Sequence, residues 1–215
     1  MLNLAFRVWL FLESRDGIIA LTRIRLAGEE DLPAILAISN WAVQHTAANF
    51  AVEPERLEDW RKDWLTTRRE YPWLVSVDGG GEVVGFAKAS PWKGRCAYNW
   101  TAEVTVYVRS KHHRQGHARA LYGMLIEVLK AQGYRTLLAG ITTPNPASVR
   151  LHESLGFRRV GGFERVGWKF GSWHDVGYWE AILDEDPGPP RQIRPVQEAL
   201  ACLMQHRRDA EIAEN

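Results

Sequence analysis

The segment YVRSKHHRQGHARALY, residues 107–122, has the residue types of an anion-binding turn. A strand-like run ends, a basic turn containing Gly116 follows, and a long amphipathic helix begins. Backbone N–H groups at a helix start have no internal partner and, together with the helix dipole, favour phosphate. Gly116 lets the backbone approach a ligand closely, while Lys111, Arg114 and Arg119 add positive charge. Neither the Walker phosphate loop nor the GxGxxG fingerprint is present, so an ordinary basic turn stays open as the alternative.

A single carboxylate, Glu103, interrupts the apolar and β-branched run TAEVTVYV at residues 101–108. Burying a carboxylate is costly unless it is paired, protonated or hydrogen-bonded. Glu103 is therefore either an outward-facing residue of a half-exposed strand or a general base. A positioned base typically accelerates a reaction by about 10²- to 10⁴-fold.

His152 is a second candidate for proton transfer. Asn145, Ser148 and His152 are spaced three and four residues apart, so they share one face of a predicted helix. Asn145 is also placed as the N-cap of that helix, directly before Pro146. The pattern alone fits a packed or solvent-facing histidine as well as a catalytic one.

The other histidines give weaker signals. The spacing of His112, His113 and His117 resembles HExxH only superficially, because the intervening Glu is absent and the stretch begins in a turn. We therefore expect no metal cofactor. His174 is expected to be structural, with Asp175 as a possible partner.

Composition limits the class of protein. The chain has 215 residues, of which 46% are hydrophobic and 25% are charged, as in a soluble globular protein. The net charge of +1 gives no basic excess for a nucleic-acid backbone, so no nucleic-acid partner is expected. The two cysteines, Cys96 and Cys202, lie far apart and in no nucleophile-activating motif, which favours a reduced, cytoplasmic protein. Ten tryptophans favour large aromatic packing surfaces or an aromatic-walled pocket.

Hydrophobic periodicity predicts the elements that position these residues. Helices are predicted over 31–43, from Pro54 onward, from Ala118 to a stop at Gly133, and from Pro146 to Gly156. Strands are predicted at 23–29, on both sides of the glycine turn 79–81, at 101–108, 136–141, 163–170 and 176–183. The resulting order, β-α-α-β-β-β-α-β-α-β-β, indicates an α+β domain with a parallel, right-handed βαβ unit from 101 to 141.

The two ends of the chain differ from its middle. Residues 1–22 are expected to be an N-terminal extension, because Arg7 and Glu13 break the apolar run and no basic region precedes it as in an export signal. No stretch is long and apolar enough to predict a membrane span. Residues 184–215 are expected to form a proline-rich, charged and solvated tail with a short helix between 195 and 213. The predicted domain therefore spans residues 23–183.

The turn around Gly116 resembles the pyrophosphate loop Q/R-x-x-G-x-G/A of the GCN5-related N-acetyltransferases (GNAT). The chain has HRQGHA at residues 113–118, in which His113 departs from the usual Gln or Arg. The segments YPWLV, PWKGRCAYNWTAEVTVYV, PNPASVRLHESLGF and GSWHDVGYW resemble the phosphinothricin acetyltransferase subfamily, over about residues 23–183. The resemblance implies a GNAT fold, in which a mixed central sheet flanked by helices holds acetyl-CoA at a splayed parallel strand pair. It also implies acetyl transfer to the α-amine of phosphinothricin, methionine sulfoximine or methionine sulfone, and a homodimer.

The same resemblance assigns roles to individual residues. Glu103 matches the subfamily's proposed catalytic glutamate, which makes the amine neutral, and His152 or Tyr107 would assist the departing thiolate. The implied contacts with coenzyme A are Val106, Tyr107, Val108, Arg114, Gln115, Gly116, His117, Ala118, Arg119 and Asn145. The implied contacts with the acceptor are Phe50, Lys93, Arg95, Tyr98, Thr105 and Val176.

The identity of the acceptor is less constrained than that of the cofactor. Lys93 and Arg95 fit an acidic amino acid, since an arginine holds a carboxylate with two donors, but the segment PWKGR alone fits a surface turn equally well. Thr142 stands where some relatives have glycine, and its larger side chain would narrow the pocket. A GNAT enzyme for another amine and an acyl-CoA-binding sensor without turnover stay open as alternatives.

Overall fold

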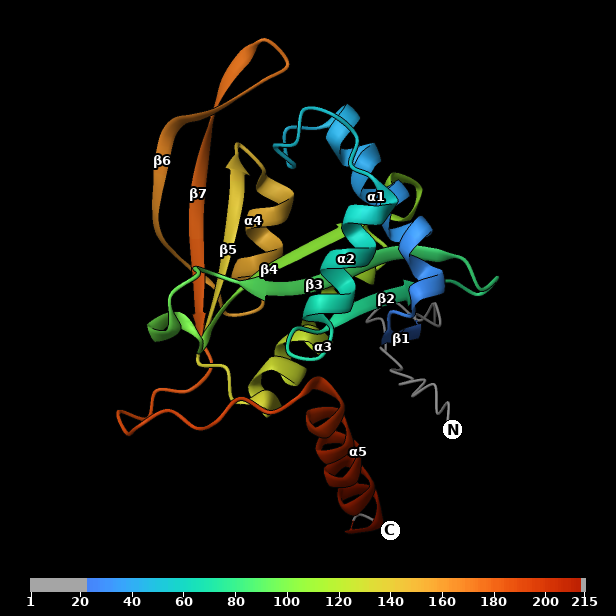
Figure 1. Cartoon of the computed structure of the whole chain (residues 1–215), viewed down its shortest axis with the longest axis vertical. Helices are drawn as coiled ribbons and strands as arrows, with labels where there is room; N and C mark the ends of the chain where they lie inside the picture. The colour runs from blue at the N-terminus through green and yellow to red at the C-terminus, as the bar shows by residue number, and fades with distance from the viewer. Residues whose placement is uncertain (1–22, 214–215) are drawn as a thin grey trace.

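One seven-stranded mixed sheet, in the order β1-β2-β3-β4-β5-β7-β6, organises the chain (Figure 1). The structure is a computed structural model that describes residues 23–213, so the proposed N-terminal extension lies outside the described residues. The strands are β1 (Arg23–Leu26), β2 (Trp73–Val77), β3 (Val83–Pro91), β4 (Thr101–Val108), β5 (Thr136–Thr143), β6 (Arg158–Lys169) and β7 (Ser172–Ile182). The helices are α1 (Leu32–His45), α2 (Leu57–Thr67), α3 (His117–Gln132), α4 (Pro146–Glu153) and α5 (Val196–Ala213). Within residues 23–213, no helix has the length and apolar character needed to cross a membrane.

The predicted α+β order and the parallel β4–α3–β5 connection are confirmed. The predicted starts of the last two strands were wrong, because β6 begins at Arg158 rather than at 163 and β7 at Ser172 rather than at 176. Val160 and Trp173 are the only apolar residues in segments 158–162 and 172–175, so neither segment shows an apolar alternation. Their extended form comes from the long antiparallel ladder that β6 and β7 form with each other.

Different helices cover the two faces of the sheet. On one face, α3 buries an apolar stripe that includes Leu121 and Leu125 against the central strands. On the other face, α1 and α2 bury a second cluster that includes Ile35, Trp60 and Trp64. The spacing of three and four residues in each helix explains why one stripe faces the sheet.

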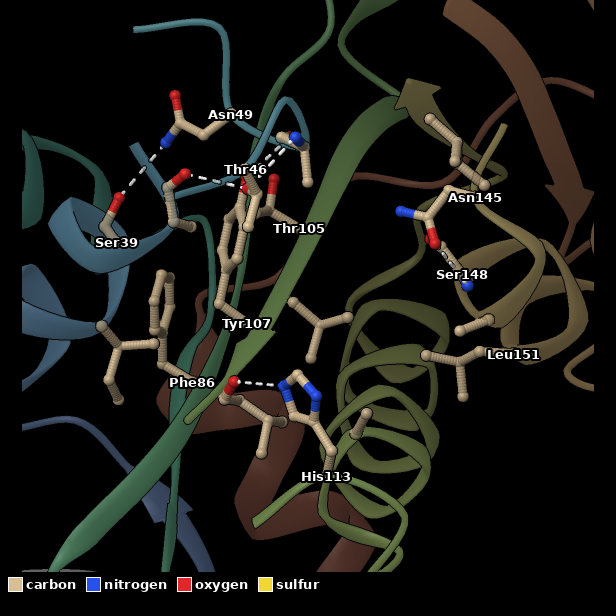
Figure 2. A pocket seen from close by; sticks show the side chains of 18 of the residues that line it. Ser39, Thr46, Asn49, Phe86, Thr105, Tyr107, His113, Asn145, Ser148 and Leu151 are labelled. Carbon is tan, nitrogen blue, oxygen red and sulfur yellow. Dashed lines mark hydrogen bonds between the residues drawn. The ribbon is translucent and has the colours of Figure 1, made fainter. Parts of the chain in front are cut away.

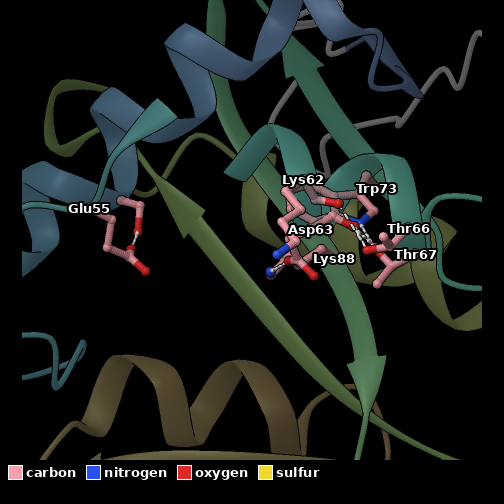
Figure 3. A network of polar contacts seen from close by, with 8 residues as sticks. Glu55, Lys62, Asp63, Thr66, Thr67, Trp73 and Lys88 are labelled. Atoms are coloured by element: carbon pink, nitrogen blue, oxygen red, sulfur yellow. Dashed lines mark hydrogen bonds and ion pairs between the residues drawn. The ribbon is translucent and has the colours of Figure 1, made fainter. Parts of the chain in front are cut away.

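A polar network around Lys88 of β3 ties α2 to the sheet (Figure 3). The Lys88 ammonium lies 2.8 Å from Asp63 Oδ2 and 4.2 Å from the centroid of the Trp73 ring. The Trp73 indole N–H donates to Thr67 Oγ1 at 3.1 Å. A cation between a carboxylate and an aromatic face is attracted by both, so α2 is held in place over β2 and β3.

The parallel strands β4 and β5 pair over only a short stretch. Their pairing runs from Thr101 opposite Thr136 to Glu103 opposite Leu138. Beyond that point β4 stays paired with β3 and β5 stays paired with β7, so the two strands diverge (Figure 1). The edge of β4 that faces β5 after Glu103 is therefore without a strand partner within the described residues.

The C-terminal segment is not the solvated appendage that its composition suggests. Val196 and Leu200 of α5 are only 1% and 2% exposed and belong to the core cluster of α3. The side-chain amide of Gln132 donates to the carbonyls of Glu70 and Arg194, both at 2.8 Å. This apolar stripe is short and lies among many charged residues, so the sequence pattern alone did not predict that α5 is buried.

Leu200→Ala is expected to lower the free energy of unfolding by about 2–5 kcal/mol, because it removes a buried side chain and leaves a cavity. Gln205→Ala, at an exposed position of the same helix, is expected to change it by no more than about 0.5 kcal/mol. Urea denaturation followed by tryptophan fluorescence measures both values. Equally small effects would show that α5 does not belong to the cooperative core.

Candidate active site

A cleft of about 1390 Å³ opens where β4 and β5 diverge. It is lined by the second half of β4, the end of β5, the start of α3, α4, and the loop between α1 and α2, residues 46–56. Figure 2 shows Asn145, which directly precedes α4, and Ser148 of α4 on one side of this space and Tyr107 and Asn49 on the other. Pockets for single small ligands usually enclose roughly 300–1,000 Å³, so this cleft has room for a large cofactor beside a second ligand.

The glycine-containing turn forms one end of the cleft. Gly116 has a φ of 87°, in the left-handed region, and α3 begins at the next residue. The first N–H groups of α3 have no acceptor within the helix. A Cβ placed on Gly116 would meet nothing within 4 Å, so the turn is open. These features favour an anion at this end of the cleft.

Several side chains of the turn are bonded to protein groups. His113 Nε2 lies 2.9 Å from a backbone oxygen of β4, and His117 Nδ1 lies 2.7 Å from Ser76 Oγ. Arg119 donates to Ser154 Oγ at 2.8 Å. The rings of His113 and His117 therefore do not converge on one point, and the groups that favour an anion are the N-terminus of α3 and the cleft-lining Arg114.

A separate group near the turn, Asp78, Glu82 and His112, places ligand-type atoms within 4.8 Å of one another. Its central carboxylate is already paired, because Glu82 lies 3.1 Å from the Lys111 ammonium and 3.5 Å from Arg109. This arrangement favours an ion-paired surface cluster over a metal site.

Tyr107, on the unpaired edge of β4 between Val106 and Val108, lines the cleft with both neighbours. Its hydroxyl donates to the carbonyl of Ala48 at 3.0 Å. Burial, with a smaller contribution from nearby Glu55, raises the pKa of Tyr107 to about 12. A phenol with a raised pKa and an engaged proton is a poor acid for a thiolate, so these contacts favour an anchoring role.

Glu103 occupies the last position at which β4 and β5 are paired. It projects from the same face of β4 as Tyr107, and its Oε1 would lie 3.8 Å from a Cβ on Gly140. Glu103 is not itself among the cleft-lining residues, but the next two residues, Val104 and Thr105, are, so Glu103 lies at the border of the cleft where the strands diverge. Burial raises the pKa of Glu103, and no charge among the described residues offsets that shift. A half-buried carboxylate of this kind is suited to proton abstraction near neutral pH.

His152 is buried on the α3 face of the sheet and is 3% exposed. Its Nδ1 lies 2.7 Å from the Ser148 carbonyl oxygen and its Nε2 lies 3.1 Å from Tyr122 Oη. Burial lowers the pKa of His152, so the neutral ring donates from Nδ1 and accepts the tyrosine proton at Nε2. In this state His152 has no free proton to give to a ligand.

Asn145 caps α4 as predicted, because its Oδ1 accepts the Ser148 N–H at 3.2 Å. The amide nitrogen of Asn145 points into the cleft in Figure 2. The capping role and a contact with a ligand are therefore compatible.

The family model of the acetyltransferase (GNAT) domain matches residues 24–177, which is more than half of the 215 residues. The chain belongs to the GNAT acetyltransferase family. The predicted GNAT fold is therefore confirmed, and the protein is an acetyltransferase.

Individual relatives of this GNAT acetyltransferase are similar over nearly their whole length. The chain is 43% identical over 173 residues to phosphinothricin N-acetyltransferase of Streptomyces viridochromogenes, covering 80% of this chain and 93% of the relative. It is 40% identical over 169 residues to L-methionine sulfoximine/L-methionine sulfone acetyltransferase of Pseudomonas aeruginosa, with coverages of 78% and 98%. A solved phosphinothricin acetyltransferase from Sinorhizobium meliloti, in complex with acetyl-CoA, matches with a TM-score of 0.76 and 30% identity, with coverages of 79% and 93%.

The acceptor residues implied by the resemblance fall into two groups in this GNAT acetyltransferase. Phe50 and Thr105 line the cleft, and so does Thr142. Val176 of β7 and Glu103 are not among the cleft-lining residues, but both approach Gly140, which lines the cleft. A Cβ on Gly140 would be 3.7 Å from Val176 Cγ1 and 3.8 Å from Glu103 Oε1. These residues come from the front face of the sheet, the face covered by α1 and α2.

The second group is outside the cleft. Lys93, Arg95 and Tyr98 are exposed residues of the β3–β4 loop and are not among the cleft-lining residues; nor is Gln115 of the anion-binding turn. In Figure 1 the β3–β4 loop lies at the paired end of β4, opposite to the end where β4 leaves β5. A single copy of this GNAT acetyltransferase therefore does not bring the three loop residues together with Phe50.

Sequence reasoning missed a polar group in α1 and the α1–α2 loop. Ser39, Asn49 and Glu55 line the cleft. Asn49 Nδ2 donates to Ser39 Oγ, and Ser39 Oγ donates to Glu55 Oε2, both at 3.4 Å. The loop has no hydrophobic period, and contacts distant in sequence place it, so no local signal identified these residues in the GNAT acetyltransferase.

Proposed function

We propose that this enzyme transfers the acetyl group of acetyl-CoA to the α-amine of a small amino-acid analogue such as phosphinothricin, methionine sulfoximine or methionine sulfone. The observation that carries the proposal is one continuous cleft through the diverging strands. It joins the anion-binding turn on the α3 face to Phe50 and Thr105 on the front face. The names of the relatives supply the acceptor class.

The residues around the cleft fit acetyl-CoA. The unpaired N–H groups at the start of α3 suit a pyrophosphate, and Gly116 leaves space for it. The unpaired edge of β4 at Val106, Tyr107 and Val108 offers strand-like hydrogen bonds to the amides of a pantetheine arm. In this arrangement the thioester reaches the point of divergence beside Glu103.

Glu103 takes a proton from the substrate ammonium, directly or through a water molecule, in the proposed reaction. The amine lone pair then forms a C–N bond with the thioester carbonyl carbon, and the carbonyl electrons move onto its oxygen. When the carbonyl re-forms, the C–S bond breaks and its electron pair leaves with sulfur. The nitrogen gives up its second proton and the thiolate gains one, so transfer is direct and needs no acyl-enzyme.

His152 or Tyr107 assists the departing thiolate in this proposal. The two candidates lie on opposite faces of the sheet. Tyr107 Oη is held by the α1–α2 loop, whereas His152 Nε2 lies 3.1 Å from Tyr122 Oη on the face of the anion-binding turn. Of the two candidates, His152 therefore lies on the face of the anion-binding turn, and Tyr107 lies on the opposite face. Burial also raises the pKa of Tyr122, so its hydroxyl orients the His152 ring and is no better an acid than Tyr107.

We further propose that the enzyme is a cytoplasmic homodimer without a nucleic-acid partner. The β6–β7 hairpin carries large apolar side chains that are at least 46% exposed, namely Val160, Phe163, Val166, Trp168, Phe170 and Trp173. Large exposed apolar patches mark interfaces. Both cysteines are free, and the net charge is only +1, which supports a reducing compartment and disfavours nucleic acid.

A panel of acceptors tests the proposed reaction. Release of free thiol from acetyl-CoA is measured with phosphinothricin, methionine sulfoximine, methionine sulfone, ordinary amino acids and polyamines. Efficient turnover of the first three is expected. Turnover of another amine alone would keep the acetyltransferase and reject the proposed acceptor. No turnover of any amine, with coenzyme A still bound, would favour an acyl-CoA-binding sensor.

A further inference from the structure

Two hydrogen bonds from distant parts of the chain hold the α1–α2 loop over the front of the cleft. The Tyr107 hydroxyl donates to the carbonyl of Ala48 at 3.0 Å. The Lys169 ammonium, at the end of β6, donates to the carbonyl of the next residue, Asn49, at 2.6 Å. The two donors are 59 and 120 residues away from their acceptors, so the loop joins β4 to the β6–β7 hairpin.

The Lys169 side chain is buried, as expected of a residue with a structural role. It is only 5% exposed, although lysine side chains normally keep their ammonium group in water. Its ammonium also lies 5.0 Å from the centroid of the Phe170 ring. Burying an unpaired ammonium is costly, so the hydrogen bond to Asn49 is needed to offset part of that cost.

Phe50, the residue after Asn49, rests on a glycine of β6. A Cβ placed on Gly167 would lie 2.3 Å from Phe50 Cε2 and 2.6 Å from its Cζ, closer than any real contact. Gly167 is paired with His174 of β7, and the Phe50 and His174 rings are 6.2 Å apart. Only a hydrogen atom at position 167 lets the Phe50 ring approach β6 this closely.

A bulge in β6 brings Gly167 to this position. The β6–β7 register shifts between Phe163 and Gly167, and the Asp175 carboxylate accepts the backbone N–H of Arg165 at 2.7 Å. Arg165 itself has a φ of 49°, in the left-handed region. The bulge thus changes the course of the β6 backbone at the place where the α1–α2 loop contacts the hairpin.

We propose that Gly167, Lys169 and Tyr107 form a clamp that fixes the α1–α2 loop, and that Gly167 is a positioning residue for acceptor specificity. Through this clamp, the β6–β7 hairpin fixes the position of the Phe50 ring. The position of the ring in turn determines the space available to the acceptor side chain beside Thr105. The inference rests on the proposed function, because it assigns the front of the cleft to the acceptor. Gly167 is not among the cleft-lining residues, so acetyl-CoA, which is proposed to contact α3 and the edge of β4, is not expected to touch it.

Gly167→Ala tests the clamp, with Gly161→Ala as its matched control. Both glycines are in β6, but a Cβ on Gly161 would meet nothing within 4 Å. The atoms that meet the new methyl group at position 167 are at the end of the Phe50 side chain, so the ring is expected to move while the fold is kept. The KM of the acceptor should rise by roughly tenfold or more, since small displacements at a reacting centre are costly. The KM of acetyl-CoA should change by less than about twofold, and Gly161→Ala should leave both values unchanged.

Repeating the substitution in a Phe50→Ala background isolates the ring contact. Gly167→Ala should have no further effect on the acceptor KM there, because the ring that it displaces is absent. An equal effect in both backgrounds, or an equal rise in both KM values, would overturn the role of Gly167. Lys169→Met, which removes the ammonium and keeps an unbranched side chain, is expected to raise the acceptor KM in the same direction.

Amide hydrogen exchange gives a readout that needs no acceptor. Gly167→Ala and Lys169→Met should speed exchange in residues 46–52 and leave α3 unchanged, whereas Gly161→Ala should match the wild type. Unchanged exchange in the loop would contradict the clamp even if turnover falls. Faster exchange in an enzyme that acetylates none of the proposed acceptors would reject the acceptor class and keep the clamp.

Discussion

Glu103→Gln is expected to lower turnover at neutral pH by about 10²- to 10⁴-fold, the usual contribution of a general base. Glutamine is nearly isosteric with glutamate, so the variant keeps the shape of the site and loses only the ability to take the proton. Steady-state thiol release measures the change in kcat, and calorimetry measures the affinity for coenzyme A. That affinity should stay near the wild-type value, because Glu103 borders the cleft at the point where β4 leaves β5, away from the anion-binding turn.

The pH profile separates a base from a binding group. Burial raises the pKa of Glu103, so wild-type activity should fall, as pH decreases, at a higher pH than an ordinary glutamate would give. The glutamine variant should lose this acidic limb. Its deficit should also shrink as pH rises towards the pKa of the acceptor amine, because the amine then needs no base. A deficit of the same size at every pH would contradict the role of Glu103 as the base.

The sequence was sufficient for the local parts of the fold. The helix α3 follows from its three-and-four spacing and from Gly133, whose φ of 100° ends it as predicted. The Asn145 cap of α4 likewise depends on neighbours within one turn. The family resemblance then predicted the roles of individual residues, such as Glu103, which hydrophobic periodicity cannot predict.

The parts that were missed depend on contacts distant in sequence. Nothing near Lys169 or Gly167 indicates that they meet a loop 120 residues away. The family resemblance also predicted which residues contact the acceptor, but not where they lie in the fold. Lys93 and Arg95 match acceptor contacts, yet they lie outside the cleft of one chain. Matches to the family's residues therefore predicted the type of reaction, whereas only the tertiary structure shows which of these residues lie in the same cleft.

The placement of Tyr107 and His152 changes how proton delivery to sulfur is understood. Each was a candidate acid in the sequence, but each has its hydrogen-bonding groups engaged: Tyr107 with Ala48, and His152 with Ser148 and Tyr122. A neutral His152 that accepts from Tyr122 orients the tyrosine hydroxyl at the α3 face. His152 and Tyr122 should therefore be tested together in a double-mutant cycle rather than one at a time.

Gly116→Asp is expected to weaken coenzyme A binding by on the order of a hundredfold or more, because like charges forced together cost several kcal/mol. Gly116 has a φ of 87°, directly precedes α3, and has only open cleft space where a side chain would project. The new carboxylate would repel the pyrophosphate and would compete with it for the same N–H groups of the helix.

Gly116→Asn is the matched control, because asparagine has nearly the same shape as aspartate and both tolerate a left-handed backbone. Backbone strain and bulk are therefore shared, and only the charge differs. Calorimetry at low and high salt should show a large gap in Kd between the two variants that narrows as salt screens the repulsion. Equal affinities for the two variants at low salt would place the pyrophosphate elsewhere and leave the N-terminus of α3 without its assigned ligand.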